Sequence, residues 1–221
     1  MEITFKIGIL GAGRMGRTLA RLLVKAGYRV KLANSRGPDS LAEIVAELGT
    51  LASAGTPKEM VDSSDIVILA TRWEQTPPAV GELKPWSRKI VIDTTNNRFG
   101  PGAKDLYDLG DSTSSEVVAA LVPGARLVKA FNHQPIPELE SLGESPAGEK
   151  ERKAFFIAGD DSDAKQVVAQ IIRKIGGEPI DTGNLREGGR LQGTGAPLAG
   201  FGRLLGGAEA QRLLADLCKA A

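Results

Sequence analysis

The sequence predicts an α/β fold in which a doubly wound, mostly parallel sheet carries helices on both faces and ends in a small C-terminal helical extension. Three observations support this prediction. Short apolar segments rich in β-branched residues alternate with segments of helical periodicity. The apolar segments are nearly continuous, which is typical of parallel strands buried on both faces. Glycine is frequent, with 27 in 221 residues, which indicates special backbone geometry somewhere in the chain.

In the first half of the chain, each apolar segment is followed by a helical one. The expected strands are Ile3–Leu10, Arg29–Ala33, a short one near Thr50–Ala54, Asp65–Ala70 and Lys89–Asp93. The expected helices are Arg14–Ala26, which Gly27 ends, a second one that Pro38 begins and that carries Leu41, Ile44, Val45 and Leu48, and a short one at Thr56–Asp62. This alternation predicts crossover connections and therefore parallel pairing.

The second half continues the pattern and then changes character. Its expected strands are Arg126–Phe131, Ala154–Ile157 and Pro179–Asp181, and its expected helices are Ser114–Leu121, Ser162–Ile175 and Ala208–Cys218. Ser141–Lys150 is polar and turn-rich, which predicts a mobile surface loop. The glycine-rich stretch Gly188–Gly207 is expected to join the sheet to the last helix. We therefore expect one α/β domain over residues 1–183 and a C-terminal extension over residues 184–221.

Composition excludes several classes of function. The formal net charge is +1, which gives no support to a nucleic-acid partner. No apolar run approaches the roughly 20 residues that cross a bilayer, and the N-terminus begins directly with a strand-like segment, so we expect a soluble, cytoplasmic protein without a membrane partner. With Cys218 as its one cysteine and His133 as its one histidine, the chain is expected to hold no disulfide and no metal site. Cys218 is interpreted as a small buried apolar group.

The motif Gly11-Ala12-Gly13-Arg14-Met15-Gly16 has the spacing G-x-G-x-x-G between a predicted strand and a predicted helix. Gly11 permits a tight turn, Gly13 lets the backbone approach a diphosphate, and Gly16 allows the helix to pack closely on the strand. The helix N-terminus offers free N–H groups and a partial positive charge to phosphates. The motif therefore predicts a Rossmann-type dinucleotide site that includes Arg14 and Met15; a glycine-rich turn without ligand is the alternative.

The end of the second strand predicts which dinucleotide binds. Readers of NAD usually carry a carboxylate there to bind the ribose 2′-hydroxyl. This chain has Asn34, Ser35 and Arg36 instead, and no carboxylate until Asp39. A hydroxyl and a guanidinium would bind a 2′-phosphate, so the sequence favours NADP(H). Arg36 as a solvated loop residue is the alternative.

Polar residues follow the later strands, where ligands of such sheets bind. Thr71 and Trp73 are candidates for the nicotinamide side of the cleft, although Trp73 could instead be a packing anchor. Asn96 and Asn97 could bind the nicotinamide ribose or form a turn.

Groups able to act as acids or bases are few at these strand ends. His133 is a weak candidate for a general acid because histidine titrates near neutrality, and a merely polar surface role is the alternative. Lys129 lies inside a predicted strand, where packing or solvation at an edge would explain it. A site poor in acid–base groups suits hydride transfer between two redox rings, which needs proximity and orientation more than proton relays.

Taken together, these segments resemble the NADPH:coenzyme F420 oxidoreductase family, and related domains occur in eukaryotic six-transmembrane metalloreductases. The resemblance covers nearly the whole chain. It is carried by GILGAGRMGRTLARLLVKAGYRV with ANSRGPDSL, by DIVILATRWE, by SSEVVAALVPGARLVKAFN and by IAGDDSDAKQVVAQIIRKIGGEPIDTG.

The resemblance implies phosphate contacts at Ser35 and Arg36 and nicotinamide contacts around Thr71 and Trp73. It places a deazaflavin, coenzyme F420, near Asn132–Pro135, which makes Asn132, His133 and Pro135 candidate substrate-binding residues, and near Gly183–Leu191. It also implies direct hydride transfer between nicotinamide C4 and deazaflavin C5 without a catalytic side chain.

The chain departs from the family's deazaflavin loop, because Asn132-His133-Gln134-Pro135 stands where His-Thr-Ile-Pro is expected. A flavin, a quinone or a metal chelate therefore remain alternative acceptors. An imine or β-hydroxyacid reductase and a non-catalytic NADPH-sensing module are the other hypotheses. The apolar, glycine-rich segment Gly193–Leu205 and the last helix would expose a patch in a monomer, which predicts a homodimer.

Overall fold

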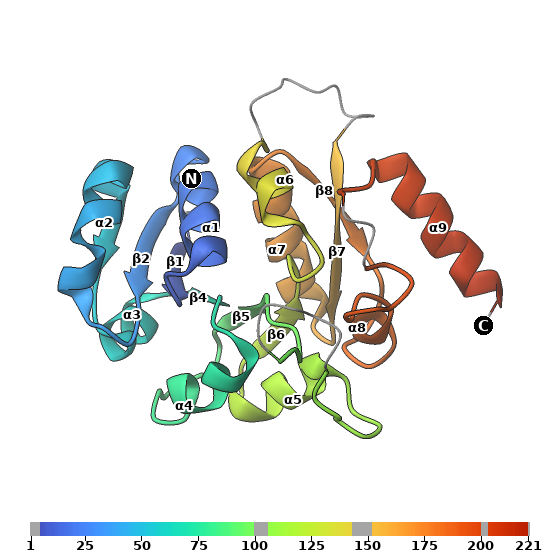
Figure 1. Ribbon diagram of the computed structural model, residues 1–221, viewed down its shortest axis with the longest axis horizontal. Helices are drawn as coiled ribbons and strands as arrows, with labels where there is room; N and C mark the ends of the chain where they lie inside the picture. Colours follow the sequence, from blue (N-terminus) through green and yellow to red (C-terminus); the bar gives the residue numbers. More distant parts are fainter. Residues whose placement is uncertain (1–4, 100–105, 143–151, 200–202, 221) are drawn as a thin grey trace.

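The computed structural model describes residues 5–99, 106–142, 152–199 and 203–220, and the α/β fold expected from the sequence is confirmed (Figure 1). These parts of the chain contain an eight-stranded sheet of order β3-β2-β1-β4-β5-β6-β7-β8. The strands are β1 Lys6–Leu10, β2 Arg29–Ala33, β3 Ala52–Ala54, β4 Ile66–Leu69, β5 Ile90–Asp93, β6 Arg126–Lys129, β7 Lys153–Gly159 and β8 Gly177–Asp181. Strand order reverses direction beside β1 and β4, which is where ligands bind in sheets of this kind.

Helices cover both faces of the sheet. They are α1 Arg14–Lys25, α2 Ala42–Leu48, α3 Pro57–Ser63, α4 Thr76–Val80, α5 Ser114–Leu121, α6 Ile136–Glu140, α7 Ser162–Lys174, α8 Glu187–Leu191 and α9 Gly207–Ala220, with short 3-10 turns η1 Pro38–Leu41, η2 Gly49–Leu51 and η3 Trp73–Gln75. One apolar core lies between the sheet and α1, α2, α6 and α7. A second lies between the opposite face and α3, α4 and α5.

Pairing departs from the parallel pattern at one place. Strands β1 to β6 pair in parallel, but β7 is antiparallel to β6, with Val128 opposite Gly159. A parallel pair needs a connection that crosses the sheet, usually through a helix of a dozen residues or so. Strand β7 instead begins beyond the end at which β6 finishes, so its connection does not cross.

Three short helices escaped prediction from the sequence, namely α4, α6 and α8. Each has five residues, and their sequences TPPAV, IPELE and EGGRL contain proline or glycine. One and a half turns are too short to show an apolar periodicity. The expected loop at 141–150 lies outside the described residues beyond Leu142.

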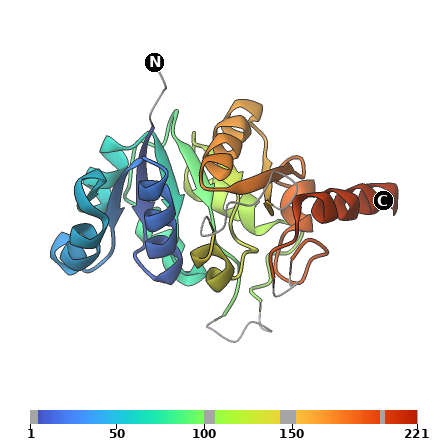
Figure 2. The same cartoon turned by 90° about the horizontal axis from the view of Figure 1, so that it is seen from above.

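The C-terminal region corrects two expectations. The stretch 188–207 is more than a connection, because Leu198 and Leu205 are buried in a third apolar cluster against β7 and β8, and Leu204 is buried in the first core. These leucines therefore add no exposed apolar patch. Cys218 is exposed, because it lies on the outer part of α9, which projects from the body of the molecule (Figures 1 and 2). No helix in the described residues is long and apolar enough to span a membrane.

Candidate functional site

The turn between β1 and α1 has the geometry that its glycines make possible. Gly11 adopts φ +104°, a backbone conformation that residues with a side chain rarely adopt. A Cβ at Gly11 would collide with the carbonyl of Ala70, and a Cβ at Gly16 would collide with the carbonyl of Gly11. Gly13 differs, because a Cβ there would point into open space. The turn is therefore tight on its inner side and open at Gly13.

The N-terminus of α1 is left free by the chain's own side chains. Its N-cap is Gly13, no side chain caps it, and no acidic residue lies in its first turn. In contrast, α3, α5 and α7 are capped by Thr56, Thr113 and Asp161, which accept hydrogen bonds from their helices. The exposed N–H groups and the positive end of the helix dipole are thus available to an anion.

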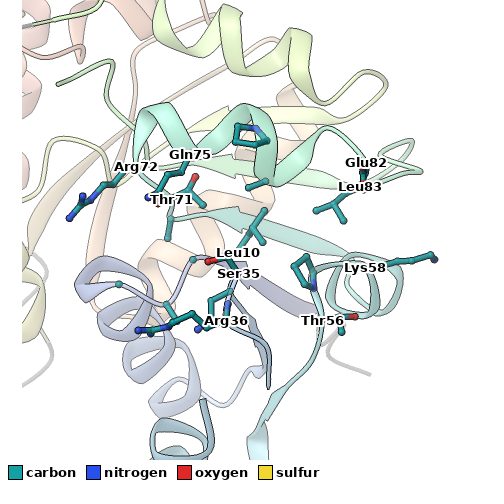
Figure 3. A pocket seen from close by; sticks show the side chains of 18 residues that line it. Leu10, Ser35, Arg36, Thr56, Lys58, Thr71, Arg72, Gln75, Glu82 and Leu83 are labelled. Carbon is teal, nitrogen blue, oxygen red and sulfur yellow. The ribbon is translucent and has the colours of Figure 1, made fainter. Parts of the chain in front are cut away.

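A cleft of about 920 Å³ opens beside this turn (Figure 3). It unites six of the residues singled out in the sequence: Gly11, Gly13, Asn34, Ser35, Arg36 and Thr71. Its other wall, formed by the segments around α3 and α4, was not anticipated and includes Thr56, Lys58, Arg72, Gln75 and Glu82. Figure 3 shows Arg36 and Arg72 extending in the same direction from opposite walls.

Asn34 supports the loop that carries the two candidate phosphate-binding residues. Its Oδ1 accepts a hydrogen bond from the Arg36 N–H at 2.9 Å, and its Nδ2 donates to Ser40 Oγ at 2.9 Å. Ser35 and Arg36 are exposed, and neither side chain has a hydrogen-bond or ion-pair partner among the described residues. The loop is therefore ordered by Asn34 and presents a free hydroxyl and a free guanidinium.

Arg14 and Met15 do not offer their side chains to this cleft. The Arg14 guanidinium forms a bidentate ion pair with Glu140 of α6, at 3.1 and 2.8 Å, and holds the pKa of that carboxyl below its usual value. Met15 packs against the first apolar core. Both residues can therefore meet a ligand only through the backbone at the start of α1.

A second, smaller pocket of about 210 Å³ lies at the ends of β4 and β5. Its walls include Thr71, Trp73, Thr94, Thr95 and Asn96. Trp73 lines this pocket and also packs against the second core, as expected for a packing anchor. Thr71 and Arg72 line both pockets, so they lie where a ligand would pass from one to the other.

An ion pair that the sequence interpretation missed is buried beneath the small pocket. Asp93 ends β5 and Lys129 ends β6, directly opposite each other, and both side chains are fully buried. Lys129 Nζ donates to Asp93 Oδ2 at 2.9 Å, to the Thr95 carbonyl and to Ser114 Oγ at 3.3 Å. The sequence interpretation of Lys129, as a residue explained by packing or by solvation at an edge, is therefore wrong. Opposite charges at the last positions of two buried strands were the signal that could have revealed this pair.

The loop after β6 is tied to the small pocket. Asn96 Nδ2 donates to the Asn132 carbonyl at 2.8 Å, and Asn132 Nδ2 donates to Asn96 Oδ1 at 3.2 Å and to the Gln192 carbonyl at 2.7 Å. Asn97 instead donates to the Tyr107 carbonyl. The preceding residue, Phe131, has φ +65° and is buried with its ring edge against Phe155. Because this backbone conformation is unfavourable for a residue with a side chain, the turn is held by its packing.

His133 does not have the properties of a general acid. Burial, and secondarily the charge of Lys129, lower its pKa to about 3, so the imidazole is neutral at pH 7. Its Nε2 lies 3.4 Å from the Phe156 N–H and also contacts the Gln134 side chain. The ring lies 4.9 Å from the ring of Phe156. A neutral imidazole in contact with the chain argues against the general-acid role for His133. The residue as a whole is half-buried, but its Nδ1 is buried, so its ring is more than a polar surface group.

Of the three candidate acceptor-side residues, Asn132 and His133 are thus engaged within the chain, and Pro135 is the N-cap of α6. None of the three lines either pocket. The arrangement can therefore hold an extended, anionic two-part ligand across both pockets, with the phosphates at α1. Among the described residues that line the small pocket, the ionisable side chains are Arg72, Arg98 and the exposed Glu74.

Comparison with known proteins agrees with this geometry. Residues 6–97 match the family described as NADP oxidoreductase, coenzyme F420-dependent. A hypothetical protein from Sinorhizobium meliloti has a similar crystal structure, with 34% identity, a TM-score of 0.82, and 92% of this chain and 96% of that chain covered. A proposed F420-dependent NADP reductase from Arthrobacter sp. FB24 is 23% identical, with a TM-score of 0.65 over 82% and 86% of the two chains.

A curated relative is the metalloreductase STEAP3 of Rattus norvegicus, which is 30% identical over 181 residues. That match covers 81% of this chain but 34% of the relative. The matched part of the chain thus covers between 22% and 36% of the length of the curated relatives.

Proposed function

We propose that this protein transfers a hydride between NADP(H) and a deazaflavin or flavin-like acceptor, because residues 6–97 match the family of coenzyme F420-dependent NADP oxidoreductases. The observation that carries the proposal is the cleft at the glycine turn, which combines an uncapped helix N-terminus with Ser35 and Arg36. The helix N-terminus fits the diphosphate of NADP(H), and the pair Ser35 and Arg36 fits its 2′-phosphate.

The residues of the chain fit an NADP(H) molecule lying across both pockets. The backbone at Gly11, Gly13, Arg14, Met15 and Gly16 would hold the diphosphate, and Asn34 would keep Ser35 and Arg36 in place for the 2′-phosphate. Thr71, Trp73 and Asn96 would surround the nicotinamide riboside in the small pocket. Arg72, between the pockets, would face the diphosphate from the other wall.

The acceptor would approach from the loop after β6. Asn132, His133 and Pro135 line neither pocket, so together with the C-terminal extension 184–221 they would form its wall beyond the small pocket, where His133 and Pro135 are partly exposed. When bound, the nicotinamide supplies a hydride, and the acceptor takes its additional proton from solvent. What the protein supplies is orientation of two rings and exclusion of water, which agrees with the scarcity of acid–base groups.

The test is anaerobic mixing of the full chain with NADPH and oxidised coenzyme F420. Bleaching of the deazaflavin absorption band, at a rate proportional to protein concentration, is the expected result. FMN, a ferric chelate and pyrroline-5-carboxylate should be assayed in parallel, because turnover with one of these and none with F420 would assign a different acceptor. Tight binding of NADPH without oxidation by any acceptor would instead favour an NADPH-sensing module.

A further inference from the structure

The threonine hydroxyl groups that line the small pocket already donate their protons inside the protein, so they can only accept hydrogen bonds from a ligand. A threonine hydroxyl carries one proton and two acceptor lone pairs, so a hydroxyl that already donates can only accept from a ligand. Thr94 Oγ1 donates to the Leu69 carbonyl at 2.8 Å, which can only accept. Thr95 Oγ1 donates to Asp93 Oδ1 at 2.7 Å. Both hydroxyl protons at the end of β5 are therefore used inside the protein.

Thr71, which lines the same pocket from the segment after β4, also uses its hydroxyl proton inside the protein. Its hydroxyl lies 2.8 Å from the hydroxyl of Thr76, and Thr76 Oγ1 is 3.0 Å from the Arg72 carbonyl. The carbonyl must accept from Thr76, whose single proton is then used. The two bonds can both form only if Thr71 donates to Thr76. Thr71 thus also has only lone pairs to offer a ligand.

The backbone N–H groups of Thr94 and Thr95 add no donor to this pocket. The N–H of Thr94 donates to the Leu69 carbonyl at 3.3 Å, and the N–H of Thr95 donates to Asp93 Oδ1 at 2.8 Å. Asp93 in turn is held by the buried ammonium of Lys129. A carboxylate accepts and does not donate, so this ion pair maintains the direction of both bonds from Thr95.

We propose that the three threonines form an acceptor wall for the carboxamide –NH₂ of the nicotinamide. This assignment rests on the proposed binding of NADP(H). An amide nitrogen brings two N–H donors, whereas a carbonyl oxygen placed against the same wall would face only lone pairs. The carboxamide oxygen would then turn towards Arg72, which lines the same pocket and donates without accepting. The wall thereby sets the orientation of the ring.

Equilibrium binding of two cofactor analogues to the unaltered protein tests this directly. The acetylpyridine analogue of NADP⁺ replaces –NH₂ by –CH₃, whereas the thionicotinamide analogue keeps –NH₂ and changes the oxygen to sulfur. In titration calorimetry, the acetylpyridine analogue should bind about tenfold more weakly than NADP⁺, because buried acceptors lose their donors. The thionicotinamide analogue should bind within about threefold of NADP⁺, because its donors remain.

Variants of Thr95 test whether the weaker binding of the acetylpyridine analogue depends on the threonine wall. Thr95→Val removes the acceptor, so the discrimination against the acetylpyridine analogue should shrink, whereas Thr95→Ser keeps the oxygen and should restore it. If Thr95→Val does not fold, Thr71→Val provides the same comparison from the segment that follows β4. Equal affinities of NADP⁺ and the acetylpyridine analogue for the unaltered protein would overturn the assignment. Binding of none of the three dinucleotides would overturn the proposed function and this assignment with it.

Discussion

At the residue scale, two arginines on opposite walls of the cleft would contact different parts of the proposed cofactor. Arg36 follows β2 beside Ser35, whereas Arg72 follows β4 and borders both pockets. Both side chains are exposed, so their substitution should leave the core intact. Binding measurements can therefore separate recognition of the 2′-phosphate from recognition of the diphosphate.

Arg36→Ala should weaken NADPH binding by about 10- to 100-fold, since a charge-assisted hydrogen bond contributes roughly 1.5–3 kcal/mol. NADH lacks the 2′-phosphate, so its affinity should not change. Fluorescence titration with both cofactors measures this. Arg29→Ala, an exposed arginine at the opposite end of the same strand, is the matched control and should change neither affinity. An equal loss for NADPH and NADH in Arg36→Ala would contradict the assignment.

Arg72→Ala should weaken NADPH and NADH by the same factor, about tenfold, because both cofactors contain the diphosphate. The same titrations test it, with the ratio of the two affinities as the decisive quantity. A loss confined to NADPH would place Arg72 at the 2′-phosphate instead.

His133 predicts a pH dependence of stability. Because its pKa is lowered to about 3 from 6.5, the unfolded chain binds a proton at this side chain over a pH range in which the folded chain does not. The free energy of unfolding should therefore fall as the pH drops below about 6.5, by up to about 1.4 kcal/mol per pH unit from this group. Urea unfolding between about pH 6.5 and 5.5, above the range of most carboxylates, measures the slope. His133→Gln should flatten it, and an unchanged slope in that variant would refute the prediction.

At the scale of elements, β5 and β6 bring a buried ion pair under the small pocket. Burial of two charges is unfavourable unless each finds partners, and Lys129 has three. The pair therefore adds little net stability as a whole, but the loss of one partner leaves a buried charge uncompensated. Its clearest consequence is the position of Thr95 and the loop that lines the pocket.

Lys129→Met should lower the free energy of unfolding by about 3–5 kcal/mol, measured by urea unfolding at pH 7. The double variant Asp93→Asn with Lys129→Met removes both charges and should regain part of this loss. Lys89→Met is the matched control for the loss of a lysine. Lys89 Nζ donates to the Ser64 carbonyl, so its removal leaves no carboxylate without a partner. A Lys129→Met protein as stable as the parent would show that the charge of Asp93 does not depend on this partner.

At the scale of the whole molecule, α9 is only partly covered by the rest of the described chain. It packs on β8 through one apolar stripe, and Leu213, Leu214 and Leu217 on that stripe are only half-buried. Figures 1 and 2 show the helix projecting from the body of the molecule. A second copy of the chain could cover the remainder of this stripe.

We therefore expect a homodimer, which sedimentation velocity at micromolar concentration would detect. Leu217→Lys should shift the population towards monomer, because it introduces a charge into the half-buried stripe. Arg212→Ala, on the exposed side of the same helix, should leave the dimer intact. A monomer at these concentrations for the parent chain would exclude the interface.

Local patterns were sufficient for the strands, the longer helices and the glycine turn. Continuous apolar segments and helical periodicity depend on neighbouring residues, and so does the G-x-G-x-x-G spacing that predicted the turn in which Gly11 adopts φ +104°. The pair Ser35 and Arg36 was also readable, because its place at the end of β2 follows from the order of strand and helix. Residues 1–4, 100–105, 143–151, 200–202 and 221 lie outside the described part of the chain.

The remaining features depend on contacts between segments far apart in the chain. Arg72 reaches the cleft of Arg36 because β4 and β2 flank β1, and Lys129 meets Asp93 because β6 pairs with β5 in a particular register. The low pKa of His133 follows from burial, which the polar residues next to it in the sequence did not indicate. Periodicity records which face of an element is apolar, but it carries no information about which distant element will cover that face. The chemistry of this site arises from those pairings.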